Sequence, residues 1–253
     1  MNKYKTYISI DDTDEIGFPK STGQISEEIR DFVEENFSKC EVVTRHQLFI
    51  HEDIPYTSHN SSMCFISYLN EEEKLKVLDF MIKHIEQNCA PSSQAGICIG
   101  FEKDFTSKEE LINFGLDAKK KVLTKTEAYS MAKKQNIHLS EHKNAGAGVI
   151  GALAGVALRL YGFDGRVKGV IKTKTKILIL IEVLNLKNIE IIKDIDSKKE
   201  LDYSLVSKAN PNVKLYIQDK LKAVYLNHKS TILVRKISND KYQNLSIDEL
   251  RNY

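Results

Sequence analysis

Apolar residues in the first hundred positions recur in short strand-like runs and in longer runs with helical spacing. The spacing of Ile25, Ile29, Phe32 and Val33 places these side chains on one side of a helix. In chain order the patterns predict a strand, a helix, two strands, a helix and a strand, at residues 4–10, 21–37, 40–50, 62–69, 71–87 and 95–101. This β-α-β-β-α-β order is typical of the ferredoxin-like fold.

Beyond residue 101 the pattern changes twice. Residues 108–135 have helical spacing with a break near Gly115, and residues 137–140 predict a short strand. A glycine-rich segment then leads into a helix that ends near Gly162. The rest of the chain is rich in predicted strands, at residues 167–173, 176–183, 213–218, 223–227 and 231–237.

These elements predict an α/β fold of the α+β class with two parts. Residues 1–165 would hold the ferredoxin-like pattern and the helical glycine-rich region, and residues 166–253 would form a strand-rich C-terminal part. The longest apolar run, residues 177–184, contains Glu182 and is interpreted as a buried strand, because a membrane helix needs about 20 apolar residues. The polar tail from Asp240 is expected to fray.

The composition favours a globular protein. Of 253 residues, 42% are hydrophobic and 28% are charged, which argues against wholesale disorder. The N-terminus lacks the apolar stretch of a secretory signal, so a cytoplasmic protein is expected. The cysteines form no CxxC pair, which disfavours a zinc ribbon, and we expect them to be core residues: Cys40, Cys64, Cys89 and Cys98.

Charge is distributed unevenly, although the net charge is only +2. Residues 166–253 carry 18 Lys and Arg against 10 Asp and Glu, whereas residues 1–165 carry 19 against 25. This asymmetry suggests a polyanionic partner such as RNA or tRNA near the basic C-terminal part. The alternative is a surplus of solvated lysines from an AT-rich genome. The basic segment 168–176 is also a candidate for strand pairing across a homodimer.

Three carboxylates occupy four positions directly after the first predicted strand: Asp11, Asp12 and Asp14. They repel one another unless a cation compensates them, and Mg²⁺ prefers one or two carboxylates together with phosphate oxygens. The segment therefore predicts a metal site with a catalytic role. The alternative is a solvated acidic turn that caps a helix.

Hydroxyl groups open the first predicted helix. Ser21 and Thr22 precede Gly23, and hydroxyls with backbone N–H groups at a helix N-terminus form a natural anion site. We expect Ser21 or Thr22 to bind phosphate or accept a phosphoryl group, with Gly23 in the binding site. A plain helix cap is the alternative.

A second candidate phosphate site lies at the start of the later glycine-rich helix. Gly146, Gly148 and Gly151 fit the pattern G-x-G-x-x-G, in which glycine lets the backbone approach a phosphate closely. The preceding region is predicted to be helical, so the segment is not interpreted as a Rossmann fingerprint. Close helix packing through Gly151, Ala152 and Gly155 is the structural alternative.

A polar loop over residues 55–62 joins two predicted strands. His59 is a candidate general base there, with His46 and His51 as other candidates nearby. Asn60 offers hydrogen bonds to a nucleotide or to a second substrate. An ordinary turn is the alternative.

Together these motifs resemble the isoleucine-tRNA agmatinylcytidine synthetase family. Its members carry a DDTD motif after the first strand, a hydroxyl-rich helix start, an arginine-bearing strand pair leading into an I-P-aromatic loop, and a G-x-G-x-[IV]-G-A-L-A helix start. The corresponding segments follow in the same order and at similar separations across residues 4–165: residues 11–14, Ser21 or Thr22, Arg45 with residues 54–56, and residues 146–154.

The resemblance implies an ATP-binding, kinase-like region joined to the ferredoxin-like pattern. In that family ATP activates the base carbonyl of an anticodon cytidine, and agmatine displaces the activated oxygen. The resemblance implies that three carboxylates hold Mg²⁺ and ATP, those of Asp11, Asp12 and Asp14. It also implies that Gly146 and Gly148 contact phosphates and that Ser21 or Thr22 is a phosphorylatable hydroxyl.

The chain departs from the family in its polar loop. Residues 57–61 read TSHNS where the family has a K-T-R-G-N-like segment, so a lysine and an arginine that grip phosphate are missing. Family members also carry an OB-type RNA-binding domain and a zinc ribbon, for which no counterpart is expected here. We therefore expect a stand-alone paralogue with a changed substrate.

Three functions are compatible with these residues. The leading hypothesis is an ATP- and Mg²⁺-dependent transferase or synthetase that activates a substrate oxygen. The second is a non-catalytic nucleotide- or RNA-binding module, and the third is a small-molecule binding protein with a relic site. The leading hypothesis requires the early carboxylates and the late glycine segment to meet in space.

Overall fold

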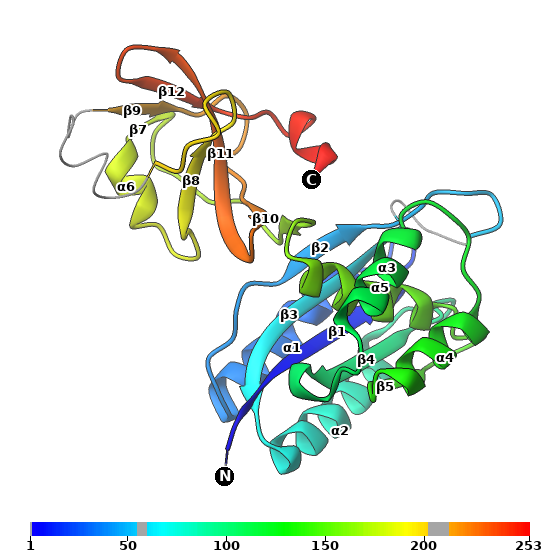
Figure 1. Cartoon of the computed structure of the whole chain (residues 1–253). Coiled ribbons are helices and arrows are strands. Elements are labelled where there is room, and N and C mark those ends of the chain that lie inside the picture. Colours follow the sequence, from blue (N-terminus) through cyan, green and yellow to red (C-terminus); the bar gives the residue numbers. More distant parts are fainter. Residues whose placement is uncertain (1, 55–59, 202–212) are drawn as a thin grey trace. The chain divides into compact units, whose positions relative to one another are not determined.

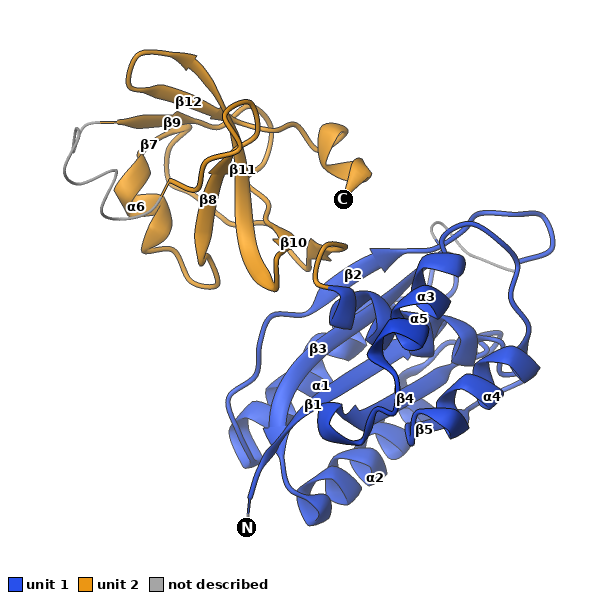
Figure 2. Ribbon diagram, viewed as in Figure 1, with its two compact units in different colours: residues 1–161 blue, residues 162–253 orange. Residues whose placement is uncertain are grey.

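The chain folds into two compact units in a computed structural model, which describes residues 2–54, 60–201 and 213–253. Residues 1–161 form the first unit and residues 162–253 form the second (Figure 2). In the described part of the chain, no helix combines the length and the apolar character needed to cross a membrane.

The first unit is built on an antiparallel sheet with the strand order β5-β4-β1-β3-β2. Helix α1 (Thr22–Asn36) connects β1 to β2, and helix α2 (Glu71–Asn88) connects β3 to β4. The order β4-β1-β3-β2 with these two crossovers is the ferredoxin-like topology, so this prediction is confirmed. The strands are β1 (Tyr4–Asp11), β2 (Thr44–Gln47), β3 (Ser61–Leu69), β4 (Gly96–Phe101) and β5 (His138–Glu141).

Helices cover both faces of this sheet (Figure 1). Ile8 and Ile10 of β1 belong to a buried cluster with Ile25 of α1 and Met81 of α2. Tyr7 of the same strand belongs to the cluster on the opposite face, because successive side chains of a strand point to opposite sides. That face is covered by α3 (Lys108–Asp117), α4 (Lys125–Lys134) and α5 (Gly148–Tyr161), and a short 3₁₀ helix, η1 (Glu102–Asp104), follows β4.

Capping boxes define where the first two helices begin. Ser21 Oγ accepts from the Gln24 N–H at 3.3 Å, and the Gln24 side chain accepts from the Ser21 N–H at 2.8 Å. Asn70 and Glu73 make the same reciprocal pair before α2. These bonds satisfy N–H groups that a helix leaves unpaired, and each cap contributes about 1 kcal/mol.

The predicted helical segment 108–135 is two helices, but the break is not at Gly115. Helix α3 continues through Gly115 to Asp117. A Cβ at Gly115 would lie 2.7 Å from Ala157 Cβ of α5, so this glycine serves close helix packing rather than helix termination.

Helix α5 lies directly against the sheet through small residues. A Cβ at Gly155 would overlap the Oγ atoms of Ser9 on β1 and Ser62 on β3. The later part of the glycine segment therefore serves close packing, which was the structural alternative for this segment. This packing also brings the start of α5 to the end of β1, where Asp11 lies.

The described part of the second unit is a mixed sheet with a short α-helix and a 3₁₀ helix. Its strand order is β6-β10-β11-β12-β9-β7, and β8 pairs in parallel with β11. Val224, Leu233, Leu245 and Leu250 form a buried cluster. The elements are β6 (Arg166–Val167), β7 (Ile177–Ile179), α6 (Leu180–Leu184), β8 (Ile191–Asp194), β9 (Lys214–Tyr216), β10 (Val224–Leu226), β11 (Lys229–Ser238), β12 (Lys241–Asn244) and the 3₁₀ helix η2 (Glu249–Asn252).

Three predictions for this unit are wrong. Residues 177–184 change from β7 to α6, because the Glu182 side chain accepts from the Ile179 N–H at 3.1 Å and starts a helical turn. Strand β6 ends at Val167 rather than at residue 173. The tail does not fray, since β12 pairs with β11 and β9 and Leu250 is buried. Pairing of copies through residues 168–176 stays a prediction.

Candidate functional site

The loop after β1 begins inside the protein. Asp11, the last residue of the strand, is 8% exposed, and Asp12 is half-buried. Asp12 has a φ of 54°, in the left-handed region that aspartate tolerates better than most residues. This conformation turns the chain sharply at the end of the sheet, so that the segment with Asp12 and Asp14 no longer continues along β1.

The buried start of this loop raises the pKa of two carboxylates, those of Asp11 and Asp12. Burial, and then the neighbouring Asp12 and Asp14, raise the pKa of Asp11 well above its ordinary value, against one backbone hydrogen bond from Asp12. Burial and the nearby Asp14 raise the pKa of Asp12 to about 6, while a backbone hydrogen bond from Gln94 lowers it. No basic side chain of the described residues is among the groups that shift either pKa. Such a cluster gains stability from a bound cation.

Asp14 and Thr13 tie the loop to the start of α1. The Thr22 N–H donates to Asp14 Oδ2 at 3.0 Å, and the Thr13 N–H donates to Thr22 Oγ1 at 3.4 Å. Ser21 is the N-cap of the helix, as the cap alternative predicts, and Gly23 is buried in the first turn. The predicted anion site at 21–23 is therefore adjacent to the acidic loop.

The late glycine segment meets the early carboxylates. A Cβ at Gly151 would overlap Asp11 Oδ2, and a Cβ at Gly148 would lie 2.9 Å from the Asp11 carbonyl oxygen. Only a residue without a side chain allows α5 to approach the end of β1 so closely. The two segments that the sequence marks as candidate sites thus form one region.

The turn before α5 is held by Gln94. The Ala147 N–H donates to Gln94 Oε1 at 3.2 Å, and the Gly148 N–H donates to the Gln94 carbonyl at 2.9 Å. Gly146 has a φ of 61°, and a Cβ there would overlap the Glu141 side chain. Sequence analysis missed Gln94, because a single glutamine in a loop carries no recognisable pattern.

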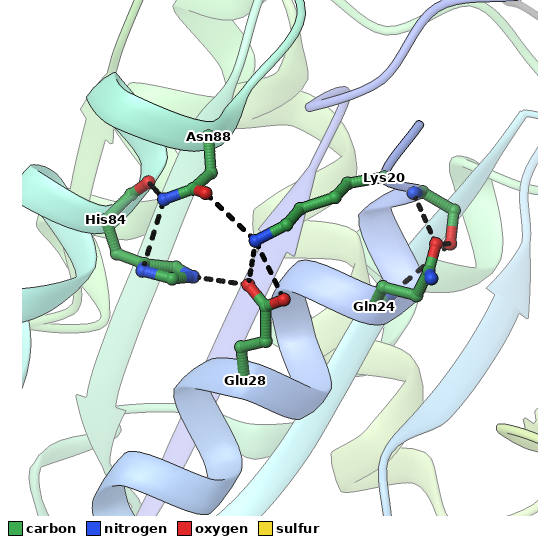
Figure 3. A network of polar contacts seen from close by, with 6 residues as sticks. Lys20, Gln24, Glu28, His84 and Asn88 are labelled. Carbon is green, nitrogen blue, oxygen red and sulfur yellow. Dashed lines mark hydrogen bonds and ion pairs between the residues drawn. The ribbon is translucent and has the colours of Figure 1, made fainter. Parts of the chain in front are cut away.

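A polar network links α1 to α2 beside the hydroxyl-rich helix start (Figure 3). Lys20 Nζ lies 2.8 Å from Glu28 Oε1 and donates to Asn88 Oδ1 at 2.9 Å. His84 Nε2 lies 2.7 Å from Glu28 Oε2. Burial raises the pKa of Glu28, but the contacts with Lys20 and His84 outweigh it and lower that pKa. Lys20, although next to Ser21 in sequence, is thus engaged between the helices.

The structure describes only part of the predicted polar loop. His59 and residues 55–58 lie outside the described residues. Asn60 Nδ2 donates to the Phe49 carbonyl at 2.6 Å, which holds the connection between β2 and β3. His46 is buried with its Nε2 2.8 Å from Thr44 Oγ1, and His51 Nδ1 lies 3.4 Å from Asp53 Oδ2.

The donor set suits a hard cation held by few protein ligands. In the described ranges, no group of three or more His, Cys, Asp or Glu is arranged to hold a metal, so the three aspartates do not form a closed cage. The hydroxyl of Thr13 is buried and finds no partner in the same part of the chain. Carboxylates without a positive neighbour fit Mg²⁺, which takes one or two carboxylates and completes its shell with water or phosphate oxygens.

Fold and site together define a ferredoxin-like α+β unit in which an acidic loop lies against a glycine-rich helix start. The same fold occurs in TiaS, an agmatidine synthetase that acts on an isoleucine tRNA. Its complex with that tRNA and ATP matches with a TM-score of 0.53 and 24% identity, over 61% of this chain and 36% of that chain. No family model and no curated protein matches the sequence.

Two further structures give the same result. A tRNA fluorescent labeling enzyme matches with a TM-score of 0.52 and 24% identity, over 60% of this chain and 36% of that chain. The complex of TiaS with its tRNA, AMPCPP and agmatine matches with a TM-score of 0.52 and 20% identity, over 72% and 44% of the two chains. The chain thus spans less than half the length of these structures. The resemblance inferred from the motifs is confirmed as a partial TiaS-like fold.

Proposed function

We propose that the first unit binds ATP with Mg²⁺ and acts as a transferase or synthetase that activates a substrate oxygen. The observation that carries this proposal is the direct approach of Gly148 and Gly151 to Asp11. It places the carboxylates of the acidic loop next to the N-terminus of α5. A cation-bound phosphate chain needs carboxylates for the cation and the positive end of a helix dipole for the phosphates.

Each residue has a role in this proposal. Asp12 and Asp14 would hold Mg²⁺, while the buried Asp11 would support the loop from beneath. When bound, Mg²⁺ neutralises phosphate oxygens and stabilises charge that develops in transfer. Gly146 and Gly148 let backbone approach the phosphates, and Thr22 at the start of α1 lies next to Asp14.

The substrate class is proposed from the fold neighbours. Two of them are complexes of TiaS with an isoleucine tRNA, one with ATP and the other with AMPCPP and agmatine. A carbonyl oxygen of an RNA base is therefore the first substrate class to test. The altered polar loop, residues 57–61, supports a substrate different from that of TiaS.

Calorimetric titration with a non-hydrolysable ATP analogue and Mg²⁺ tests the proposal. We expect Asp12→Asn and Asp14→Asn to weaken binding at least about tenfold, since each removes a charge from the cation site. The matched control is Asp79→Asn, a solvent-exposed aspartate of α2 paired with Lys83. Binding by both site variants as tight as by the wild type and the control would reject the assignment.

A second function, RNA binding by the second unit, is supported by two lysines that lie side by side on neighbouring strands. Lys241 of β12 lies directly opposite Lys214 of β9, and both are exposed. Like charges opposite each other on paired strands are unfavourable unless an anion compensates them. RNA affinity measured against salt should show a steep slope, and Lys214→Gln with Lys241→Gln should reduce that slope by about 2. Binding that is independent of salt would reject this function.

A further inference from the structure

Gln94 uses three of its polar groups at the candidate site. It lies half-buried between α2 and β4, two residues before Gly96. The register pair of Asp11 with Gly96 places Gln94 beside the acidic loop, where its backbone lowers the pKa of Asp12 through a hydrogen bond. Its carbonyl accepts from the Gly148 N–H at 2.9 Å. Its side-chain oxygen accepts from the Ala147 N–H at 3.2 Å. One residue therefore contacts both the acidic loop and the glycine turn.

We propose that Gln94 is the positioning residue that holds the acidic loop and the glycine turn at the separation needed for a cation-bound phosphate chain. This inference rests on the proposed nucleotide function. Gln94 acts through Asp12, Ala147 and Gly148 and carries out no chemical step itself.

The surrounding contacts support this role. The segment that contains Gln94 runs between the two halves of the site. On one side the Ala90 N–H donates to the Thr13 carbonyl at 2.9 Å. On the other side the His142 N–H donates to the Ala95 carbonyl at 2.7 Å, and Asn144 Nδ2 donates to the Ser93 carbonyl at 2.7 Å. Residues 90–95 thus form a bridge between the two halves, and Gln94 is the residue of that bridge whose side chain reaches the glycine turn.

Gln135 is a matched control, since it uses its amide in the same way elsewhere. It is fully buried, and its Oε1 accepts from the Ser107 N–H at 2.9 Å just before α3. Replacement by methionine keeps the volume and removes the acceptor at either position. Gln94→Met and Gln135→Met should therefore both lower thermal stability, but only Gln94→Met should act on the candidate site.

Hydrogen exchange of the full chain, with and without a non-hydrolysable ATP analogue and Mg²⁺, tests the inference. Gln94→Met removes the acceptor of the Ala147 N–H, so we expect faster exchange in residues 145–150. We expect it in residues 11–14 as well, because the segment loosened by this loss also carries the backbone contact with Asp12. Gln135→Met should speed exchange near residue 107. Faster exchange at 145–150 alone would overturn the coupling, whether or not a nucleotide binds. If the methionine variant fails to fold, Gln94→Asn tests the same expectation by hydrogen exchange, because it keeps the amide but withdraws it by one methylene.

Affinity separates positioning from simple structural support. We expect Gln94→Met to weaken binding of the analogue about tenfold, whereas Gln135→Met at equal or lower stability leaves it unchanged. Equal affinities for both variants would overturn the inference. If Gln94→Met speeds exchange in both segments but the analogue does not slow exchange in the wild-type protein, the proposed nucleotide function is rejected instead.

Discussion

Two buried aspartates, one in each unit, are treated in opposite ways. Asp194 is 4% exposed, and its carboxylate accepts from the Asp196 N–H at 3.2 Å and from the Ser197 hydroxyl at 2.7 Å. Asp11 is 8% exposed but shares its surroundings with two other carboxylates. Burial alone therefore does not make a carboxylate a candidate site residue, whereas burial among like charges makes Asp11 one.

The two units also differ in net charge. Residues 1–161 carry 19 Lys and Arg against 24 Asp and Glu, and residues 162–253 carry 18 against 11. In the first unit the acidic surplus includes the buried cluster at the end of β1. In the second unit the basic surplus includes exposed lysines such as Lys214 and Lys241. The first arrangement suits a small cation, and the second suits an extended polyanion.

The contact between Asp11 and Gly151 gives the largest expected effect. Gly151→Ala places a methyl group on the Asp11 carboxylate, and we expect a loss of about 3 kcal/mol of unfolding free energy, measured by urea denaturation. Gly17→Ala is the control, because open space surrounds Gly17 and only its φ of 85° is unfavourable. Asp11→Ala should partly restore the Gly151→Ala protein. A Gly151→Ala protein no less stable than the control would contradict the close approach.

The pH dependence of stability tests the crowded carboxylates. Because the pKa of Asp12 is raised to about 6, the folded state holds this proton more tightly than the unfolded state. The contribution of Asp12 to stability should be fully present below the ordinary value of 3.8 and be lost as pH rises to about 6, a loss of about 3 kcal/mol. Asp12→Asn should remove this decline and be more stable than the wild type at pH 8. Parallel pH profiles would show that Asp12 is not under this strain.

Removing each buried aspartate in turn sharpens the comparison between units. Asp194→Ala should lower the unfolding free energy by about 2 kcal/mol, because it leaves the Asp196 N–H and the Ser197 hydroxyl without their acceptor. Asp11→Asn should raise stability at neutral pH, because it removes a buried charge that no basic side chain of the described residues compensates. Thermal unfolding at pH 7.5 measures both. Equal losses in the two variants would remove the distinction.

The smallest expected effect comes from the network in Figure 3. Lys20→Met should cost about 0.5 kcal/mol, because Lys20 and Glu28 are both partly exposed. The lowered pKa of Glu28 means that this contribution is present near neutral pH and is lost as pH falls through the acidic range. Thermal unfolding at pH 7 and pH 4 with Lys83→Met, which breaks an exposed pair with Asp79, provides the measurement and its control.

Much of the first unit could be predicted because its elements carry their own patterns. Ile25 and Ile29 repeat at helical spacing, and residues 63–66 form a continuous apolar run, so each segment indicates its conformation locally. The second unit was predicted less well. Strand β12 reads KYQN, has little apolar character, and becomes a strand because β11 and β9 pair with it on either side.

The sequence by itself determined the order of elements in the first unit, the acidic segment after a strand and the glycines at a later helix start. These follow from local spacing, which relates each side chain to the axis of its own helix or strand. The tertiary structure alone decided that Gly151 lies against Asp11 and that Gln94 bonds to the glycine turn. Contacts between segments far apart in the sequence depend on which faces pack together, and no local pattern contains that information.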